Sequence, residues 1–172
     1  IGKATYWCSS CRKYLNPPAD LAAPEAGKTA ACPSCEKSLE RRVEKMSKSI
    51  GNLVTADSMC QTYGADTART YVLFVGPPDN DGEWRDEGVS GVYRFLNRVW
   101  RLVALHVEGF DPDWRNHVGE GGEEYKTVRR KVHQTAQKVT RDIERFAFNT
   151  GISAMMELVN VLTPFAERIG QK

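Results

Sequence analysis

The sequence predicts a mainly α-helical protein that carries a small cysteine-rich element near its N-terminal end. Four cysteines stand in two Cys-x-x-Cys pairs within residues 8–35, and apolar residues recur every three or four positions from residue 87 onward. Between these regions, residues 45–52 are rich in Lys, Ser, Gly and Asn, which indicates a loop. We therefore expect a small four-cysteine knuckle or ribbon, a loop with short helices, and then an α-helical bundle.

The composition of the 172 residues is that of a globular protein, with 41% hydrophobic and 27% charged residues. No apolar run approaches the roughly 18 residues that a transmembrane helix needs, and no charged-then-apolar leader is present. The sequence therefore predicts a cytoplasmic protein with no membrane partner. The formal net charge of +2 is too small to indicate a nucleic-acid partner, so the distribution of charge matters more.

The two cysteine pairs have the spacing of a zinc site. Cys8 and Cys11 form one pair, Cys32 and Cys35 form the other, and twenty residues separate the pairs. Each pair can chelate from one tight turn, so that two turns complete a tetrahedron around a structural Zn²⁺. The alternatives are two disulfides or a redox Cys-x-x-Cys, which the missing secretory leader and the absence of a following helix make less favourable. Cys60 lies in a helical pattern and is expected to be a small core residue.

The stretch from Lys45 to Asn52 predicts a mobile loop that suits a polyphosphate. Two lysines lie three residues apart among serines, and Gly51 follows closely. An ammonium group binds phosphate as a point charge, and serine hydroxyls and backbone N–H groups complete the shell. An ordinary solvated Lys/Ser loop is the alternative on composition alone.

Short helices are expected after this loop. Asp57 is placed to cap a helix that Gly64 ends, and Asp66 is placed to cap a second one. Residues 70–75 crowd β-branched and aromatic side chains together and, taken alone, favour a strand.

Three longer helices should follow, over about residues 87–107 and 123–146 and from a cap at Asn149 or Thr150. Pro164 is expected to kink or end the third. Their apolar stripes are expected at Val92, Phe95, Leu96, Val99, Leu102, Val103 and His106, at Val128, Val132, Val139, Ile143 and Phe146, and at Ile152, Met155, Met156, Val159 and Leu162.

Basic side chains also follow helical spacing in this region. Arg94, Arg98 and Arg101 line one face of the first helix, and the segment 125–148 has seven basic residues against two acidic ones. Such faces are either simply solvated or positioned to contact nucleic-acid phosphates.

The exact string Lys45-Met46-Ser47-Lys48-Ser49 resembles the second signature of class I aminoacyl-tRNA synthetases, whose loop closes over ATP. Residues 63–69 agree with that class. Residues 82–103 strongly resemble leucyl-tRNA synthetases, and residues 148–158 are similar to a later helix of that family. The resemblance covers roughly residues 43–108 and 125–160. Ile50 departs from it, since the family usually has a third lysine there.

The resemblance implies ATP-dependent attachment of leucine to tRNA(Leu), with ATP and Mg²⁺ used by the parent enzyme. It implies a catalytic role for Lys45 and Lys48 and ATP contacts from the whole string Lys45, Met46, Ser47, Lys48 and Ser49. It also implies a helix rather than a strand at residues 70–75. Contacts with the tRNA backbone are implied for a basic set on the long helices: Arg94, Arg98, Arg101, Arg129, Arg130 and Lys131.

The family resemblance further implies three units, comprising a four-cysteine insertion at residues 1–43, the loop and end of a catalytic domain at 44–82, and a helical tRNA-binding bundle at 83–172. Residues 76–82 break all regular structure at the second boundary, and Trp84 is expected to anchor packing there. A His-x-Gly-His motif, the first class I signature, is absent. We therefore expect a fragment, inactive alone, whose partners include the remainder of the synthetase or a companion subunit. A non-catalytic, zinc-dependent RNA-binding module is the alternative, and a redox protein is a third.

Overall fold

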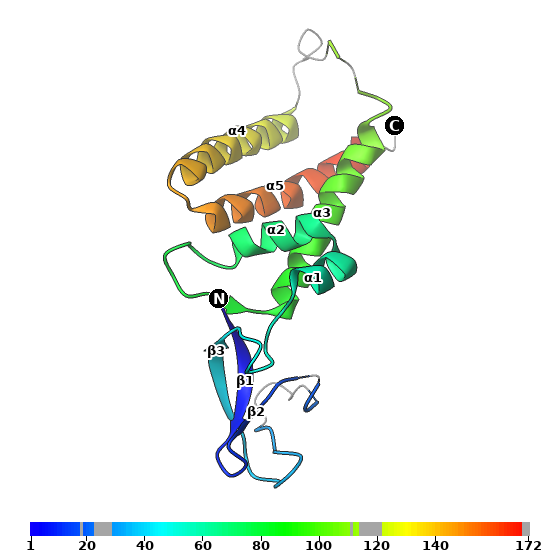
Figure 1. The fold of residues 1–172 in the computed structure, drawn as a ribbon. Coiled ribbons are helices and arrows are strands. Elements are labelled where there is room, and N and C mark those ends of the chain that lie inside the picture. Colours follow the sequence, from blue (N-terminus) through cyan, green and yellow to red (C-terminus); the bar gives the residue numbers. More distant parts are fainter. Residues whose placement is uncertain (18, 23–28, 111, 114–121, 170–172) are drawn as a thin grey trace.

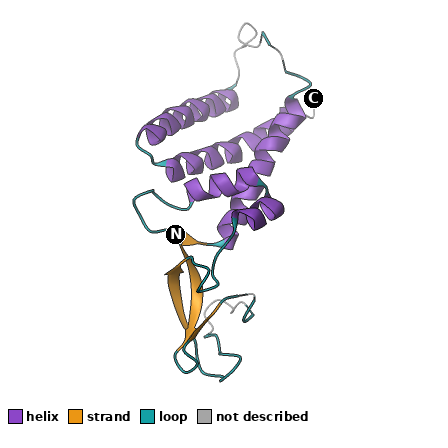
Figure 2. Cartoon of the chain, in the orientation of Figure 1, coloured by secondary structure: helices purple, strands orange, loops and turns teal. Residues whose placement is uncertain are grey.

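A computed structural model describes the 172-residue chain except at residues 18, 23–28, 111, 114–121 and 170–172. A narrow sheet with long loops forms one end of the molecule, and the helices form the other (Figures 1 and 2). The expectation of a mostly helical chain with a small cysteine-bearing element is confirmed. No helix in the described part of the chain combines the length and apolar character needed to cross a membrane.

The sheet is built around β1 (Gly2–Cys8), which pairs with three other strands. Antiparallel partners are β2 (Lys13–Leu15), on one side, and β3 (Glu40–Lys45), on the other. The two-residue strand β4 (Glu83–Trp84) pairs parallel to the start of β1. Because β3 ends at Lys45, the lysine-containing loop begins directly at the end of this strand.

Two short helices, α1 (Ala56–Tyr63) and α2 (Ala65–Phe74), follow this loop. Gly64 ends α1 with φ of 84°, as expected, and α2 confirms that the residues before Val75 are helical. The two expected caps are wrong. Thr55 caps α1, its side chain accepting a hydrogen bond from the Ser58 N–H, so Asp57 lies in the first turn. Gly64 is the N-cap of α2, which places Asp66 inside that helix.

The long helices are α3 (Asp86–His106), α4 (Glu123–Glu144) and α5 (Phe148–Ile169). Helix α5 packs against α2, α3 and α4 (Figure 1). Because α5 begins at Phe148, Asn149 and Thr150 lie in its first turn rather than at a cap, and the helix continues through Pro164.

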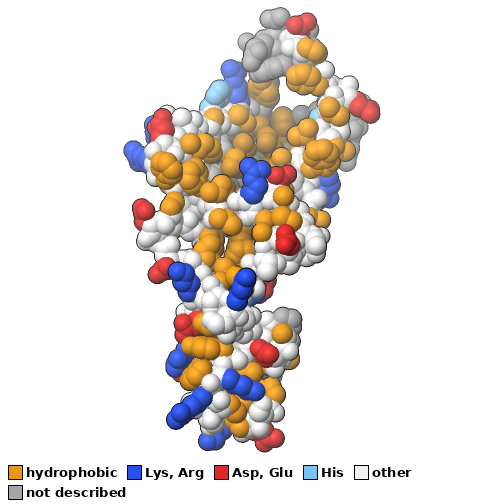
Figure 3. Space-filling model, viewed as in Figure 1, with side chains coloured by type: hydrophobic (Ala, Val, Ile, Leu, Met, Phe, Trp, Pro, Cys, Tyr) orange, Lys and Arg blue, Asp and Glu red, His pale blue; other side chains and the backbone are white. Residues whose placement is uncertain are grey.

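The expected apolar stripe of α4 is only partly buried. Val128 and Val139 are half-buried, whereas Val132 and Ile143 are exposed, and Phe146 beyond the helix is 66% exposed. Met155 of α5 and Val103 of α3 are exposed as well. Helix α4 packs chiefly on α5. That contact buries only one narrow face of α4, so the apolar residues outside this face are exposed to solvent. Figure 3 shows exposed hydrophobic side chains over the helical end of the molecule.

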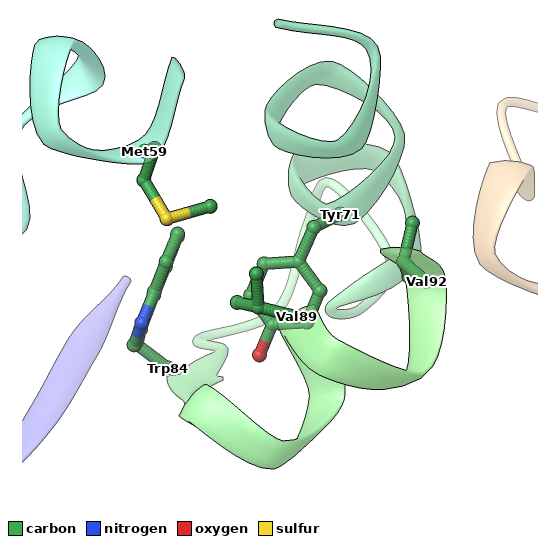
Figure 4. Packing of buried hydrophobic residues seen from close by; sticks show 5 residues of the cluster. All are labelled: Met59, Tyr71, Trp84, Val89 and Val92. Carbon is green, nitrogen blue, oxygen red and sulfur yellow. The ribbon is translucent and has the colours of Figure 1, made fainter. Parts of the chain in front are cut away.

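The main core lies where the sheet meets the helices. Side chains from α1, α2, β4 and α3 converge there, as Figure 4 shows for Met59, Tyr71, Trp84, Val89 and Val92. The Tyr71 and Trp84 rings meet edge to face at 4.8 Å, and the Trp84 indole N–H donates to Asp86 Oδ1 at 2.9 Å. The expectation that Trp84 anchors packing is confirmed.

Gly88 of α3 lies against this core and offers a sharp test of its packing. A Cβ at Gly88 would lie 2.8 Å from Tyr71 Cε2, so Gly88→Ala should lower the free energy of unfolding by about 1–3 kcal/mol. A Cβ at Gly91, three residues on, would meet no described atom within 4 Å, so Gly91→Ala should instead raise stability by about 0.5–1 kcal/mol. Urea unfolding followed by far-ultraviolet circular dichroism measures both, and equal effects would contradict this packing.

A second, smaller core surrounds the cysteine pairs. Its buried side chains are Cys8, Leu15, Cys32 and Leu39. Two of these four are cysteines, so apolar packing alone gives this end of the molecule little stability. Cys60, expected in a core, is exposed on α1, because the buried face of that short helix is used by Met59.

Candidate functional site

The four cysteines of the two Cys-x-x-Cys pairs meet at one point. Cys8 and Cys11 follow from the end of β1, and their turn is closed by the Cys11 N–H donating to Cys8 Sγ at 3.4 Å. A second turn forms at Cys32–Lys37, where the Cys32 N–H donates to the Lys37 carbonyl. Arg12 and Glu36, the residues directly after each pair, both have positive φ. The two turns are therefore built alike, and each points its thiols at the other.

The geometry of this cluster fits a four-coordinate metal ion. Cys8 Sγ lies 3.6 Å from Cys35 Sγ and Cys11 Sγ lies 3.8 Å from Cys32 Sγ, with all four sulfurs within 4.8 Å of one another. A tetrahedron with metal–sulfur bonds of about 2.3 Å has sulfur–sulfur edges of about 3.8 Å. Disulfide bonding would need roughly 2.05 Å, and all four thiols are free. The predicted ligands are thus brought together.

The electrostatics of the thiols differ from one another. The backbone N–H of Ser34 lowers the pKa of Cys32 to about 6, against the opposing effect of burial. Hydrogen bonding to Cys35, and then to Cys8, raises the pKa of Cys11 to about 12. The thiolate form is therefore favoured at Cys32 and disfavoured at Cys11 near neutral pH. A divalent cation binds thiolates and displaces the thiol protons.

The loop from Lys45 to Asn52, here the lysine loop, forms a compact turn. The Ser47 N–H donates to Asn52 Oδ1 at 2.9 Å, and the Gly51 N–H donates to the carbonyls of Ser47 and Lys48 at 3.2 Å. Gly51 has φ of 78°, which favours glycine. Asn52 is buried, and its Nδ2 donates to the Glu44 carbonyl at 3.2 Å. Internal hydrogen bonds therefore define the loop that was expected from composition alone.

The charged groups of the lysine loop face outward. Lys45 and Lys48 are exposed, and neither has an ion-pair partner among the residues that the structure describes. Met46 instead packs against the main core, which anchors the chain between the two lysines. The Ser47 and Ser49 hydroxyls lie 3.1 Å apart. This arrangement presents two exposed ammonium groups and a hydroxyl pair from an anchored turn, which is suited to an anion.

A cavity of about 500 Å³ lies beside Lys45. Its lining consists of Ile1, Gly2, Val43, Lys45, Asp81, Gly82 and Glu83. Of its two carboxylates, Glu83 is paired with Arg41 and Arg85, whose charges offset its own. The lining is thus mixed in charge, and the exposed ammonium groups of Lys45 and Lys48 are the candidates for contact with an anion.

The basic residues predicted to contact nucleic acid divide into two groups. Arg94, Arg101, Arg129 and Arg130 are exposed. Arg98, by contrast, donates to Asn160 Oδ1 at 2.7 Å and to Thr163 Oγ1 at 3.1 Å, and so fastens α3 to α5. Lys131 pairs with Glu157 of α5 at 2.8 Å. The guanidinium of Arg98 and the ammonium of Lys131 are thus engaged in helix packing.

Two further exposed arginines lie at the C-terminal end of α4, where Arg145 is the C-cap. Arg141 and Arg145 line a groove of about 290 Å³ with Gln134, Gln137, Lys138 and Asp142. Their signal in the sequence is a spacing of four residues from Gln137 through Arg141 to Arg145. Helical geometry places positions four apart on one face.

The chain is similar in sequence to curated leucine–tRNA ligases. No protein-family model matches the chain. Among curated proteins, it is 50% identical over 125 residues to a leucine–tRNA ligase of Citrifermentans bemidjiense and 48% identical over 128 residues to one of Pseudothermotoga lettingae. These matches cover 72% and 74% of the chain, which spans only 15% of either relative.

A solved structure is similar too. It is the ternary complex of Agrobacterium radiobacter K84 agnB2 LeuRS with tRNA and LeuAMS, which is 33% identical with a TM-score of 0.57. The match covers 69% of the chain and 16% of that protein.

Proposed function

From the premise that this chain corresponds to a segment of leucine–tRNA ligases, we propose that it contributes the ATP loop and tRNA-docking helices of such an enzyme. The observation that carries the proposal is sequence identity near 50% over most of the chain. The parent reaction would activate leucine with ATP in the cytoplasm and attach it to tRNA(Leu). The proposed division is residues 1–43, 44–82 and 83–172, as the sequence predicts.

In this function the lysine loop stabilises the leaving pyrophosphate. Negative charge grows on that group as the bond to the α-phosphorus breaks, so Lys45 and Lys48 stabilise the transition state more than bound ATP. The exposure of both ammonium groups supports this role. The serine hydroxyls and the backbone around Met46 complete the ATP contacts, and Mg²⁺ supplies additional charge neutralisation when it is bound. The test is adenylate formation by a complete enzyme that carries Lys48→Ala.

The cysteine cluster has a structural role in this proposal. A Zn²⁺ ion on Cys8, Cys11, Cys32 and Cys35 would hold the loops around a core too small to hold itself. The sulfur spacing near 3.8 Å supports zinc, because it is the edge of a zinc–thiolate tetrahedron. None of the four thiols then serves as a nucleophile.

The exposed basic faces of α3 and α4 are proposed to contact the tRNA backbone. The similar solved structure contains tRNA, which supports this partner. Arg94 and Arg101 remain candidates on α3, and Arg129 and Arg130 remain candidates on α4. Arg98 and Lys131 were in the predicted set, but their side chains bond to α5, so we assign them to packing instead.

The tRNA assignment makes a quantitative prediction. Replacing Arg129 and Arg130 by alanine should weaken tRNA binding by this chain and reduce the slope of log K against log salt by roughly two, because each phosphate contact releases about one counterion. Fluorescence anisotropy with labelled tRNA across a salt series measures the slope. Lys131→Gln is the matched control and should leave the slope unchanged. A slope that Arg129 and Arg130 do not alter would assign this face to solvent.

The remainder of the synthetase is the other proposed partner. Several large apolar side chains stay exposed on the helices, and Trp100 is 75% exposed. Contiguous exposed apolar patches mark surfaces that other protein covers, and Figure 3 shows hydrophobic side chains gathered over the helical end of the molecule. This supports a larger catalytic assembly rather than the alternative of an independent zinc-dependent RNA-binding module.

A further inference from the structure

Asn16 connects the cysteine-rich element to the lysine loop. It directly follows β2, which lies between the two cysteine pairs in the sequence. Its side chain is buried, with 8% exposure, and its Nδ2 donates to the Ile50 carbonyl at 2.7 Å. The nitrogen assignment follows from the partner, because a carbonyl oxygen only accepts. This bond joins residues 34 positions apart and reaches the tip of the lysine loop.

The position of Asn16 is fixed from its own side as well. Its backbone N–H donates to Asp20 Oδ2 at 2.7 Å, and its carbonyl accepts from the Asp20 N–H at 2.9 Å. The residue before it, Leu15, accepts a hydrogen bond at its carbonyl from the Thr5 hydroxyl of β1 at 3.3 Å. Asn16 is therefore held rigidly by the sheet and by its own turn before it contacts the loop.

The fit between Asn16 and the loop is close. A Cβ at Gly51 would lie 3.3 Å from Asn16 Nδ2, and Gly51 has φ of 78°. A side chain at residue 51 would thus be strained and would crowd the amide. Asn16 Oδ1 is buried and has no hydrogen-bond partner among the described residues. A buried acceptor without a partner lowers the stability of the fold. The favourable interaction of the Asn16 amide is therefore the hydrogen bond that its Nδ2 donates to the Ile50 carbonyl.

We propose that Asn16 is a positioning residue for the lysine loop. By donating to the Ile50 carbonyl, it ties the turn that carries Lys48 to the cysteine-rich element. The loop is then anchored at three points: at Lys45 by β3, at Met46 by the main core and at Ile50 by Asn16. Holding the turn in this way orders Lys48 before an anion arrives. The assignment of the lysine loop to ATP rests on the proposed function. The hydrogen bond between Asn16 and Ile50 does not depend on that assignment.

Amide hydrogen exchange in the complete 172-residue chain, followed by NMR without nucleotide, tests this tie. Asn16→Ala should accelerate exchange at the Ile50 and Gly51 N–H groups roughly tenfold, the loss expected for one net hydrogen bond. Asn16→Asp keeps the shape but turns an acceptor toward the Ile50 carbonyl, so it should accelerate exchange at least as much. The Cys32 and Glu36 N–H groups bond within the second cysteine turn and should exchange at the wild-type rate.

Lys13→Ala is the matched control. Lys13 lies on the same strand, and its ammonium donates to Ser34 Oγ at an exposed site away from the loop, so its loss should leave Ile50 and Gly51 unchanged. Unchanged loop exchange in both Asn16 variants overturns the proposal. Equal acceleration at Cys32 and Glu36 also overturns it, because Asn16 would then stabilise the whole element. Failure of the ATP role would appear separately, as a normal rate of adenylate formation in Lys48→Ala.

Discussion

Replacing Cys32 by serine should abolish stoichiometric metal binding and unfold the cysteine-rich element, while the helices stay folded. Cys32 is buried, and it belongs to a core whose four buried side chains include two of the proposed ligands. The apparent binding energy of a structural zinc ion is on the order of 10 kcal/mol, far more than the remaining apolar contacts of Leu15 and Leu39 can replace. The main core around Trp84 shares none of these side chains, so it should persist.

The measurement combines metal analysis of the purified chain with residue-resolved hydrogen exchange. Wild-type protein should contain one Zn²⁺ per chain, and a chelator should loosen residues 5–42 without changing the helical circular dichroism. Cys60→Ser is the matched control, because Cys60 is exposed on α1 and outside the cluster, and it should keep full metal content. Collapse of the helices together with the metal site would refute the separation into two cores.

The features that sequence alone predicted well are those set by local spacing. Two residues between the cysteines of each pair dictate a chelating turn, whatever surrounds it. The bounds of α3 also followed closely from periodicity, since a 21-residue helix gives many repeats of the pattern. The strand-like composition of residues 70–75 was misleading because α2 buries Tyr71 against Trp84, and that tertiary contact outweighs β propensity.

The features that sequence did not predict depend on which elements become neighbours. Asp57 and Asp66 are plausible caps, yet Thr55 and Gly64 occupy the cap positions, because such boundaries depend on one or two residues of register. An apolar stripe was expected along α4, but α4 packs chiefly on α5, and that contact leaves Ile143 of the stripe exposed.

The candidate site shows the same limit. The sequence shows which basic residues share a helix face. It does not show that the Arg98 side chain donates a hydrogen bond to Thr163, 65 residues away, because that contact depends on how α3 and α5 pack. Asn16 carried no motif at all: a lone Asn after a short strand indicates a turn. Its bond to Ile50 arises because the sheet brings β2 back toward the end of β3.

Lys48→Ala, rebuilt into a complete enzyme, should slow leucyl-adenylate formation by roughly 10²–10³-fold, the usual cost of removing one preorganised group that stabilises developing charge. Ground-state ATP binding should weaken far less, because the pyrophosphate gains its extra charge only as the bond breaks. The structure strengthens this expectation: Lys48 is exposed and lies on a turn held by Asn52, Met46 and Asn16. Losing its ammonium should therefore remove charge without disturbing the loop backbone.

Pre-steady-state adenylate formation over a range of ATP concentrations separates the two effects. Lys48→Arg is the conservative control and should recover little of the rate, because a planar guanidinium cannot take the place of a compact ammonium without moving an anchored turn. Ser49→Ala, which removes only a hydroxyl beside Ser47, should cost much less than Lys48→Ala. A Lys48→Ala enzyme with a normal maximal rate and only a raised ATP requirement would show that Lys48 stabilises bound ATP and the transition state equally. The loop would then hold ATP without stabilising the departing pyrophosphate, and the catalytic role assigned to Lys48 would be wrong.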